Sequence, residues 1–110
     1  MVSWFVFEQW QDNLPHGWGQ LTTAEGHRYV GGYRDGKKNG DGSMHHSSGE
    51  QYTGEWEDNI PHGQGVVTRE NGDRYAGQWR AGIPHGRGTA TYAASSKVEN
   101  GWWDNAVFMG

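Results

Sequence analysis

The chain of 110 residues has no cysteine, only three prolines and no apolar run long enough to cross a membrane. Without cysteine it can form no disulfide and cannot use a thiol in catalysis, and nothing indicates an oxidising compartment. The apolar stretch near the start, Val2 to Phe7, is too short for the core of a signal peptide or for a membrane span. We therefore expect a cytoplasmic protein.

Positive charge is also scarce, with 9 Lys and Arg against 13 Asp and Glu and a net charge of −4. This balance disfavours a nucleic acid or an anionic membrane as a partner held by charge alone, and we expect no nucleic-acid partner. Only 33% of residues are hydrophobic, whereas the chain holds 19 glycines and seven tryptophans. The apolar material is therefore concentrated in a few large rings, which predicts a thin core.

A unit of 23 residues recurs along the chain, and the stretch from Tyr52 to Gly65, YTGEWEDNIPHGQG, is its clearest copy. A shift by this period superposes aromatic residues on aromatic residues and glycine on glycine. The aromatic positions are Trp10, Tyr29, Tyr33, Tyr52, Trp56, Tyr75, Trp79 and Trp102. A fixed period of this size is typical of a repeat array in which each unit needs its neighbours to cover its apolar side.

Within the unit, side chains alternate in the manner of a β-strand. Alternation places Tyr52 and Trp56 on one face of a sheet and Thr53 and Glu55 on the other. Glycines alternate with the rings, because large aromatics can lie flat across a sheet only where neighbouring positions carry no Cβ. These patterns predict an all-β fold, an elongated, twisted antiparallel meander of about nine strands with little or no helix, whose core is the row of aromatic residues named above.

We expect a single domain over residues 1–110, with units at about 6–28, 29–51, 52–74 and 75–97 and a partial C-terminal cap at 98–110. In the first unit, residues 4–11 are predicted to form one strand. In the cap, the 23-residue shift places Val98 at the tyrosine position and Asn100 at the glycine position, and keeps Trp102 in the core. Terminal units of repeat arrays usually differ because they close the exposed end of the stripe.

The unit resembles the MORN repeat. Residues 52–56, Tyr-Thr-Gly-Glu-Trp, with the later His-Gly-Gln-Gly of 62–65 match the family pattern in full, as do residues 75–79 with 85–88. The resemblance implies a hairpin sheet and a scaffold or adaptor that binds other proteins, and not an enzyme. It also implies an alternative role proposed for the family, the recognition of phosphoinositides or of a membrane surface.

Three histidines at identical repeat positions, His16, His62 and His85, raise the possibility of a metal site. Equivalent positions in adjacent hairpins lie two strands apart, about 9.6 Å, which is too far for ligands of one zinc ion. We expect these imidazoles to hydrogen-bond the turns and to pack on a neighbouring tryptophan. No phosphate loop, nucleophile or paired acid stands at a recognisable spacing, so we predict no cofactor, no metal and no catalytic residue.

Surface recognition remains. We predict that aromatic and apolar residues on the outward side bind another protein, because exposed aromatics are enriched in binding sites. These residues are Phe5, Phe7, Trp18, Val30, Trp103 and Phe108. Two alternatives stay open, that the terminal segments cover the ends of the sheet and that the terminal units pair in a homodimer.

The leading hypothesis is a non-catalytic scaffold or adaptor that mediates protein–protein interaction through its sheet face or its aromatic termini. A phosphoinositide or membrane-surface module is the alternative, supported only by a small basic group, Arg28, Arg34, Lys37 and Lys38. A second alternative is a small binding protein that inhibits a partner enzyme by occlusion.

Overall fold

The computed structural model describes residues 2–6, 10–11, 14–15 and 17–110, with side chains described from Gly17 onward. Within that part of the chain every regular element is a β-strand. The strands are β1 (Val2–Val6), β2 (Trp10–Gln11), β3 (Leu14–Pro15), β4 (Gly17–Thr23), β5 (Arg28–Arg34), β6 (Lys37–His45), β7 (Gln51–Glu57), β8 (Ile60–Thr68), β9 (Arg74–Arg80), β10 (Ile83–Thr91), β11 (Val98–Asp104) and β12 (Val107–Phe108).

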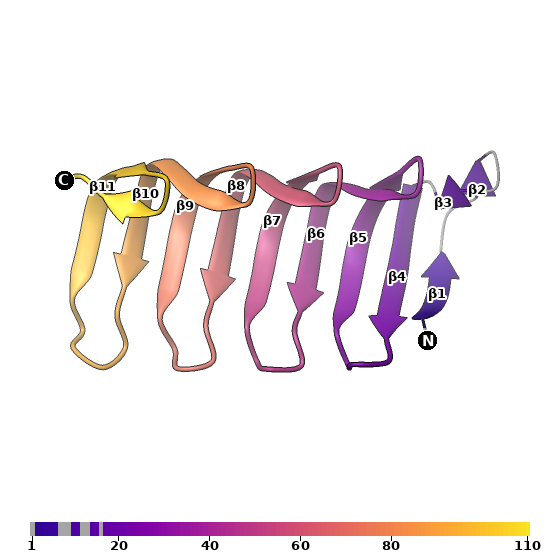
Figure 1. The fold of residues 1–110 in the computed structure, drawn as a ribbon, viewed down its shortest axis with the longest axis horizontal. Helices are drawn as coiled ribbons and strands as arrows, with labels where there is room; N and C mark the ends of the chain where they lie inside the picture. Colours follow the sequence, from indigo (N-terminus) through magenta and orange to yellow (C-terminus); the bar gives the residue numbers. More distant parts are fainter. Residues whose placement is uncertain (1, 7–9, 12–13, 16) are drawn as a thin grey trace.

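Ten of these strands form one antiparallel sheet in the order β1-β4-β5-β6-β7-β8-β9-β10-β11-β12, and β2 pairs with β3 in a separate ribbon. Consecutive hairpins stand side by side in a row, with the two termini at opposite ends (Figure 1). The molecule is accordingly long and thin, 46 × 24 × 17 Å. The predicted all-β antiparallel meander is confirmed.

Each long hairpin is divided by a register shift near its tip. In the β7–β8 pair the register is continuous as far as Gly54 opposite Gly65, and it resumes with Trp56 opposite Pro61. The tip itself is a two-residue turn in which Asp58 and Asn59 both have positive φ, 47° and 72°, the conformation of a type I′ turn. The amide of Asn59 donates to the carbonyl of Lys38 in the preceding hairpin (3.0 Å), so each tip is fastened to its neighbour.

The later tips repeat this contact. Gly82 donates to the carbonyl of Pro61 (2.9 Å) and Ala106 to that of Pro84 (2.8 Å). Histidine supports the same turns, because Nδ1 of His62 accepts the amide of Ala81 (3.4 Å) and Nδ1 of His85 that of Asn105 (3.3 Å). The predicted role of these two imidazoles in hydrogen-bonding the turns is therefore confirmed, while His16 lies outside the described residues.

The core is one row of aromatic rings on a single face of the sheet. Tyr52 and Tyr75 each meet the tryptophan of their own hairpin and that of the next edge-on, and Tyr52 lies 5.1 Å between ring centres from both Trp56 and Trp79. Tyr29 meets Tyr33 and Trp56 in the same way. Edge-to-face contacts of this kind are favoured by the ring quadrupole. The buried members of the row are Tyr29, Tyr33, Tyr52, Trp56, Tyr75, Trp79 and Trp103.

The indole N–H groups of the row and the hydroxyls of Tyr29, Tyr52 and Tyr75 have hydrogen-bond partners, as burial requires. The indole N–H of Trp56 donates to the carbonyl of Gly42 (3.1 Å), and that of Trp79 to Gly65 (3.0 Å). The hydroxyl of Tyr52 donates to the carbonyl of Glu55 (2.9 Å). Each tryptophan therefore ties its hairpin to the one before, which couples the units along the array.

Glycine is required under the tyrosine rings. A Cβ added to Gly65 would overlap the phenol ring of Tyr52, and one added to Gly88 would overlap that of Tyr75. The ring lies flat over the backbone of the neighbouring strand. This is the reason given in the sequence analysis for the glycines that alternate with the rings.

The prediction of one strand over residues 4–11 is wrong. β1 ends at Val6, and Trp10 and Gln11 belong to the separate β2–β3 ribbon. In the β1–β4 register, Trp4 lies opposite Leu21, the place that Tyr29 takes opposite Met44. Trp10 still pairs with Pro15 as Trp56 pairs with Pro61. Trp10 therefore follows Trp4 by two more residues than Trp56 follows Tyr52. A prediction based on a fixed 23-residue shift does not allow for these two additional residues.

The assignment of the two C-terminal tryptophans is also wrong, because Trp102 was expected in the core and Trp103 on the surface, and the structure shows the reverse. Trp103 is buried, with 7% of its surface exposed, whereas Trp102 is 52% exposed. The turn before β11 closes from Tyr92 to Lys97, one residue longer than the turn from Arg69 to Asp73. The extra residue moves every later position by one and exchanges the faces of the strand.

The cap accordingly places Glu99 at the tyrosine position, opposite Ala90, and Gly101 at the glycine position, opposite Gly88. The indole of Trp103 donates to the carbonyl of Gly88 (3.0 Å), the bond that Trp79 makes with Gly65. Val98 and Asn100 do not occupy these positions.

Candidate functional site

Two hollows on the aromatic face lie at equivalent positions in successive units. The first, of about 320 Å³, is bounded by Tyr52 and Trp56 from one unit and by Trp79 from the next. Its wall is completed by Pro61 from a hairpin tip and by Met44 from β6. The rings of Tyr52, Trp56 and Trp79, which belong to the aromatic row, supply much of its surface.

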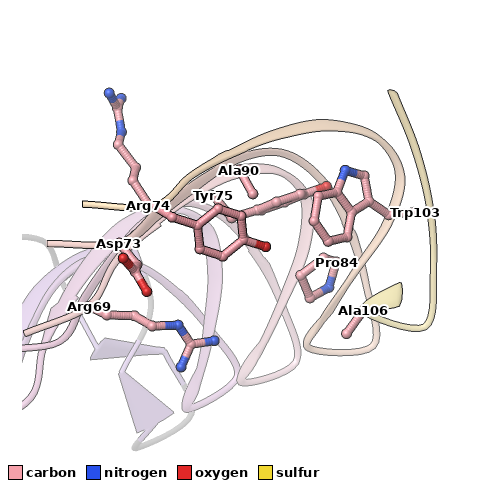
Figure 2. Close-up of a pocket in the computed structure, with 9 residues that line it drawn as sticks. Arg69, Asp73, Arg74, Tyr75, Pro84, Ala90, Trp103 and Ala106 are labelled. Atoms are coloured by element: carbon pink, nitrogen blue, oxygen red, sulfur yellow. The ribbon is translucent and has the colours of Figure 1, made fainter. Parts of the chain in front are cut away.

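The second hollow, of about 170 Å³, repeats this arrangement with Tyr75, Pro84 and Trp103. Ala90 stands where the first hollow has Val67, and Ala106 where it has Gly82. Figure 2 shows Trp103, Pro84 and Ala106 grouped at one end of this hollow. Because equivalent positions lie two strands apart, the hollows repeat at about 9.6 Å along the array.

One rim of the aromatic face carries charged side chains that are held by an ion pair and by hydrogen bonds. Arg69 bridges to Glu50 across neighbouring units (3.6 Å). The carboxylate of Asp73 accepts the amide of Ala93 (2.8 Å), and the hydroxyl of Tyr92 donates to Glu99 (2.6 Å). The first two interactions join successive turns, and the third closes the last hairpin.

Lys38 is a cation of this face that lies against the aromatic row. Its Nζ lies 5.5 Å from the ring centre of Tyr29 and 5.9 Å from that of Trp56. Burial lowers the pKa of Lys38, because desolvation disfavours the charged ammonium. Lys38 also lines the first hollow, which therefore combines aromatic rings with a half-buried ammonium and with the carboxylate of Glu50, itself bridged to Arg69.

The tyrosine hydroxyls of the row are held in the neutral form. Burial, followed by the nearby carboxylate of Glu55, raises the pKa of Tyr52 to about 12. Burial also raises the pKa of Tyr29 and Tyr75. These groups are hydrogen-bond donors that support the fold, and they are poorly suited to acid or base chemistry near neutral pH.

The opposite face of the sheet is polar in its middle. Ser43 and Thr53 hydrogen-bond side chain to side chain (3.1 Å), as do Thr89 and Asn100 (3.1 Å). Trp18 is 43% exposed on this face, and with Val30 it borders a shallow depression that Ser43 and Thr53 complete.

The residues predicted to bind a partner do not gather at one place. Trp18 and Val30 lie on the polar face, whereas Trp103 and Phe108 contact each other on the aromatic face (5.1 Å between ring centres). Phe108 belongs to β12, which folds back on β11 and covers the end of the ring row. The side chains of Phe5 and Trp10 lie outside the described part, and Phe7 lies outside the described residues.

The sequence interpretation treated Tyr52, Trp56, Tyr75 and Trp79 only as core and did not anticipate the hollows between them. Lys37 and Lys38 stand where the next unit has Ile60 and Pro61, and this difference was the available signal for a special position in the second unit. Trp102 was missed as a surface residue. It stacks against Arg87, whose guanidinium carbon lies 4.9 Å from its ring centre.

The described residues contain no group of three or more His, Cys, Asp or Glu side chains placed to hold a metal ion. Nor do they form a helix that is long and apolar enough to span a bilayer. The described part of the chain therefore presents a binding surface with apolar hollows, hydrogen-bonding groups at its edges and the half-buried ammonium of Lys38.

Comparison with known proteins agrees with this architecture. The family model for the MORN repeat matches four times in succession, over residues 9–28, 29–51, 52–74 and 75–97. A search of curated proteins finds no match to the chain. MORN repeats commonly bind proteins or membranes and are generally non-catalytic. With four matches that together cover most of its length, the chain belongs to the MORN repeat family.

Proposed function

We propose that this protein is a non-catalytic adaptor that binds another protein through its aromatic face. The supporting observation is the pair of hollows, each bounded by a tyrosine, a proline and the tryptophan of the following unit. Concave apolar sites with a few polar groups are the usual places for recognition. A repeated hollow at a fixed spacing suits a partner segment that presents apolar side chains at intervals.

The opposite face is a weaker candidate, because hydrogen-bonded Ser, Thr and Asn pairs occupy its middle. The aromatic terminus at Trp103 and Phe108 is also a weaker candidate than the hollows, since β12 already covers it. The aromatic face is therefore the part of the predicted sheet surface that we assign to the partner.

Two adjacent residues on β6 offer a test with a matched control. Met44 lines the first hollow, whereas Ser43 faces the other side of the sheet, and both are half-buried. The wild type and the Met44→Arg and Ser43→Arg variants would be immobilised and used to capture proteins from a cell extract, after thermal melts have established that each variant is folded.

We expect a set of proteins captured by the wild type and by Ser43→Arg and lost with Met44→Arg. Capture that persists with Met44→Arg, or that Ser43→Arg abolishes equally, would reject the aromatic face as the binding surface. Sedimentation with anionic vesicles serves as the companion measurement, in which a protein-binding adaptor is expected to stay in solution.

A further inference from the structure

The second unit has a lysine at a position where the other described units have an apolar ring. Pro61 pairs with Trp56, Pro84 with Trp79 and Phe108 with Trp103, whereas Lys38 pairs with Tyr33. Each of these residues follows its hairpin tip and lies against the aromatic row. A cation here gives up solvation that proline and phenylalanine do not lose.

The neighbouring tip is adapted to this lysine. The side-chain oxygen of Asn59 accepts the amide N–H of Lys38 (2.9 Å), while the amide of Asn59 donates to the carbonyl of Lys38 (3.0 Å). In the following units the residue in place of Asn59 is Gly82 or Ala106, and it faces Pro61 or Pro84, which has no N–H to satisfy. The two hydrogen bonds fix the backbone of Lys38 at the edge of the hollow.

The ammonium itself lies over rings and makes no ion pair with the side chains that the structure describes. Its Nζ is 5.5 Å and 5.9 Å from the ring centres of Tyr29 and Trp56. Among the described side chains, the three ion pairs within 4.0 Å involve Arg69, His85 and Lys97, and Glu50, which lines the same hollow as Lys38, is bridged to Arg69. The rings stabilise the charge in part, and an added anion would complete its coordination.

Apolar side chains form much of the hollow beside Lys38, with Met44, Tyr52, Pro61 and Trp79 around it, while His46, Glu50 and Asn59 contribute polar groups to its edge. From this juxtaposition we infer that the first hollow binds an acidic peptide segment of a partner protein, with an apolar side chain seated on the rings and an Asp or Glu carboxylate paired with Lys38. This inference rests on the proposed function and names the chemistry of the partner.

A single carboxylate fits this site better than a phosphorylated lipid headgroup does. The lining offers one positive charge without an ion-pair partner, and the chain as a whole carries a net charge of −4. A polyanionic headgroup at a membrane surface would need several cations and would bring a negative surface toward a negative protein.

The test is a selection from a displayed library of random linear peptides, fused so that no peptide has a free C-terminus. Wild type and the Lys38→Met variant would be used as separate targets. Methionine keeps the backbone N–H that Asn59 accepts and can cover the rings, so it removes the charge with little change in shape. Thermal melts establish that Lys38→Met is folded.

The wild type is expected to enrich peptides that combine Asp or Glu with apolar residues, and Lys38→Met is expected to lose the acidic preference. For the best peptide, Lys38→Met weakens binding about ten- to hundredfold, the effect of one charge-assisted hydrogen bond. Replacing the acidic residue of that peptide by its amide, Asp by Asn or Glu by Gln, is expected to weaken binding to the wild type by the same factor. The replacement should leave binding to Lys38→Met almost unchanged.

The selection could instead yield apolar peptides without an acidic preference that bind wild type and Lys38→Met equally and no longer bind Met44→Arg. That result would overturn the role of Lys38 and leave the proposed function intact. Peptides whose binding ignores Met44→Arg would overturn both. Binding to vesicles of phosphatidylserine or phosphoinositide that depends on Lys38, with no peptide selected, would reject a protein partner in favour of a membrane.

Discussion

Gly65→Ala is the substitution whose effect follows most directly from the aromatic row. Gly65 lies on β8 beneath the phenol ring of Tyr52, and an added Cβ would overlap that ring. The backbone of Gly65 does not have the positive φ of Gly63, which is 93°, so alanine meets no conformational barrier there. The effect of the methyl group is therefore steric.

To admit the methyl group, Tyr52 must leave its place. It then loses the hydrogen bond to Glu55 (2.9 Å) and its edge-on contacts with Trp56 and Trp79, both at 5.1 Å. One such hydrogen bond contributes about 1 kcal/mol and each ring contact about 0.5–1.5 kcal/mol. With the strain of overpacking, we expect Gly65→Ala to lower the free energy of unfolding by about 3–5 kcal/mol.

In a protein of this size such a loss lowers Tm by about 12–20 °C, measurable by circular dichroism during thermal or urea unfolding. The matched control is the same change in a Tyr52→Ala background, where the methyl group enters vacated space and should cost under about 1 kcal/mol. Equal costs of Gly65→Ala in the two backgrounds, or a wild-type melting temperature for the single variant, would refute the claim that the ring lies on this glycine.

Three further outcomes follow from the same geometry. Trp103→Ala should lower the free energy of unfolding by about 3–5 kcal/mol and Trp102→Ala by under about 1 kcal/mol, and a reversed order in urea titrations would restore the original facing assignment. Burial raises the pKa of Tyr52 from 10.0 to about 12, so its stabilising contribution is fully present below pH 10 and is lost as the pH rises towards 12. Urea unfolding midpoints measured between pH 10 and 12 should therefore fall less steeply for Tyr52→Phe than for wild type. Lys38→Met should melt no lower than wild type, since it removes a desolvated charge, and a clear loss of Tm would indicate that the lysine stabilises the fold.

Much of the fold could be predicted because the 23-residue period and the two-residue alternation act together. Tyr52, Trp56 and the glycines between them specify a strand, a face and a neighbour, and the two central units follow this pattern without exception. The same reasoning failed at Trp102 and Trp103, where one added residue in a turn exchanged the faces. The signal was present, since Gly101 and Trp103 keep the spacing of Gly77 and Trp79.

The hollows could not be predicted in the same way. They exist because the hairpin tips bend back over the rings, which depends on register shifts and on the contact of Asn59 or Gly82 with the preceding hairpin. Those contacts join residues from different units, and no local pattern records them. Likewise, the sequence marks Lys38 as a departure from proline, but only the structure shows that its ammonium lies over Tyr29.

The central claim is that the tryptophans of successive units lie on one buried face and bond the hairpin before them. Hydrogen exchange of the indole N–H groups, followed by NMR, tests it most directly. Trp56, Trp79 and Trp103 donate to buried glycine carbonyls and should exchange slowly, whereas Trp18 and Trp102 should exchange rapidly. Rapid exchange at Trp56 and Trp79, or protection of Trp102 in place of Trp103, would contradict the account.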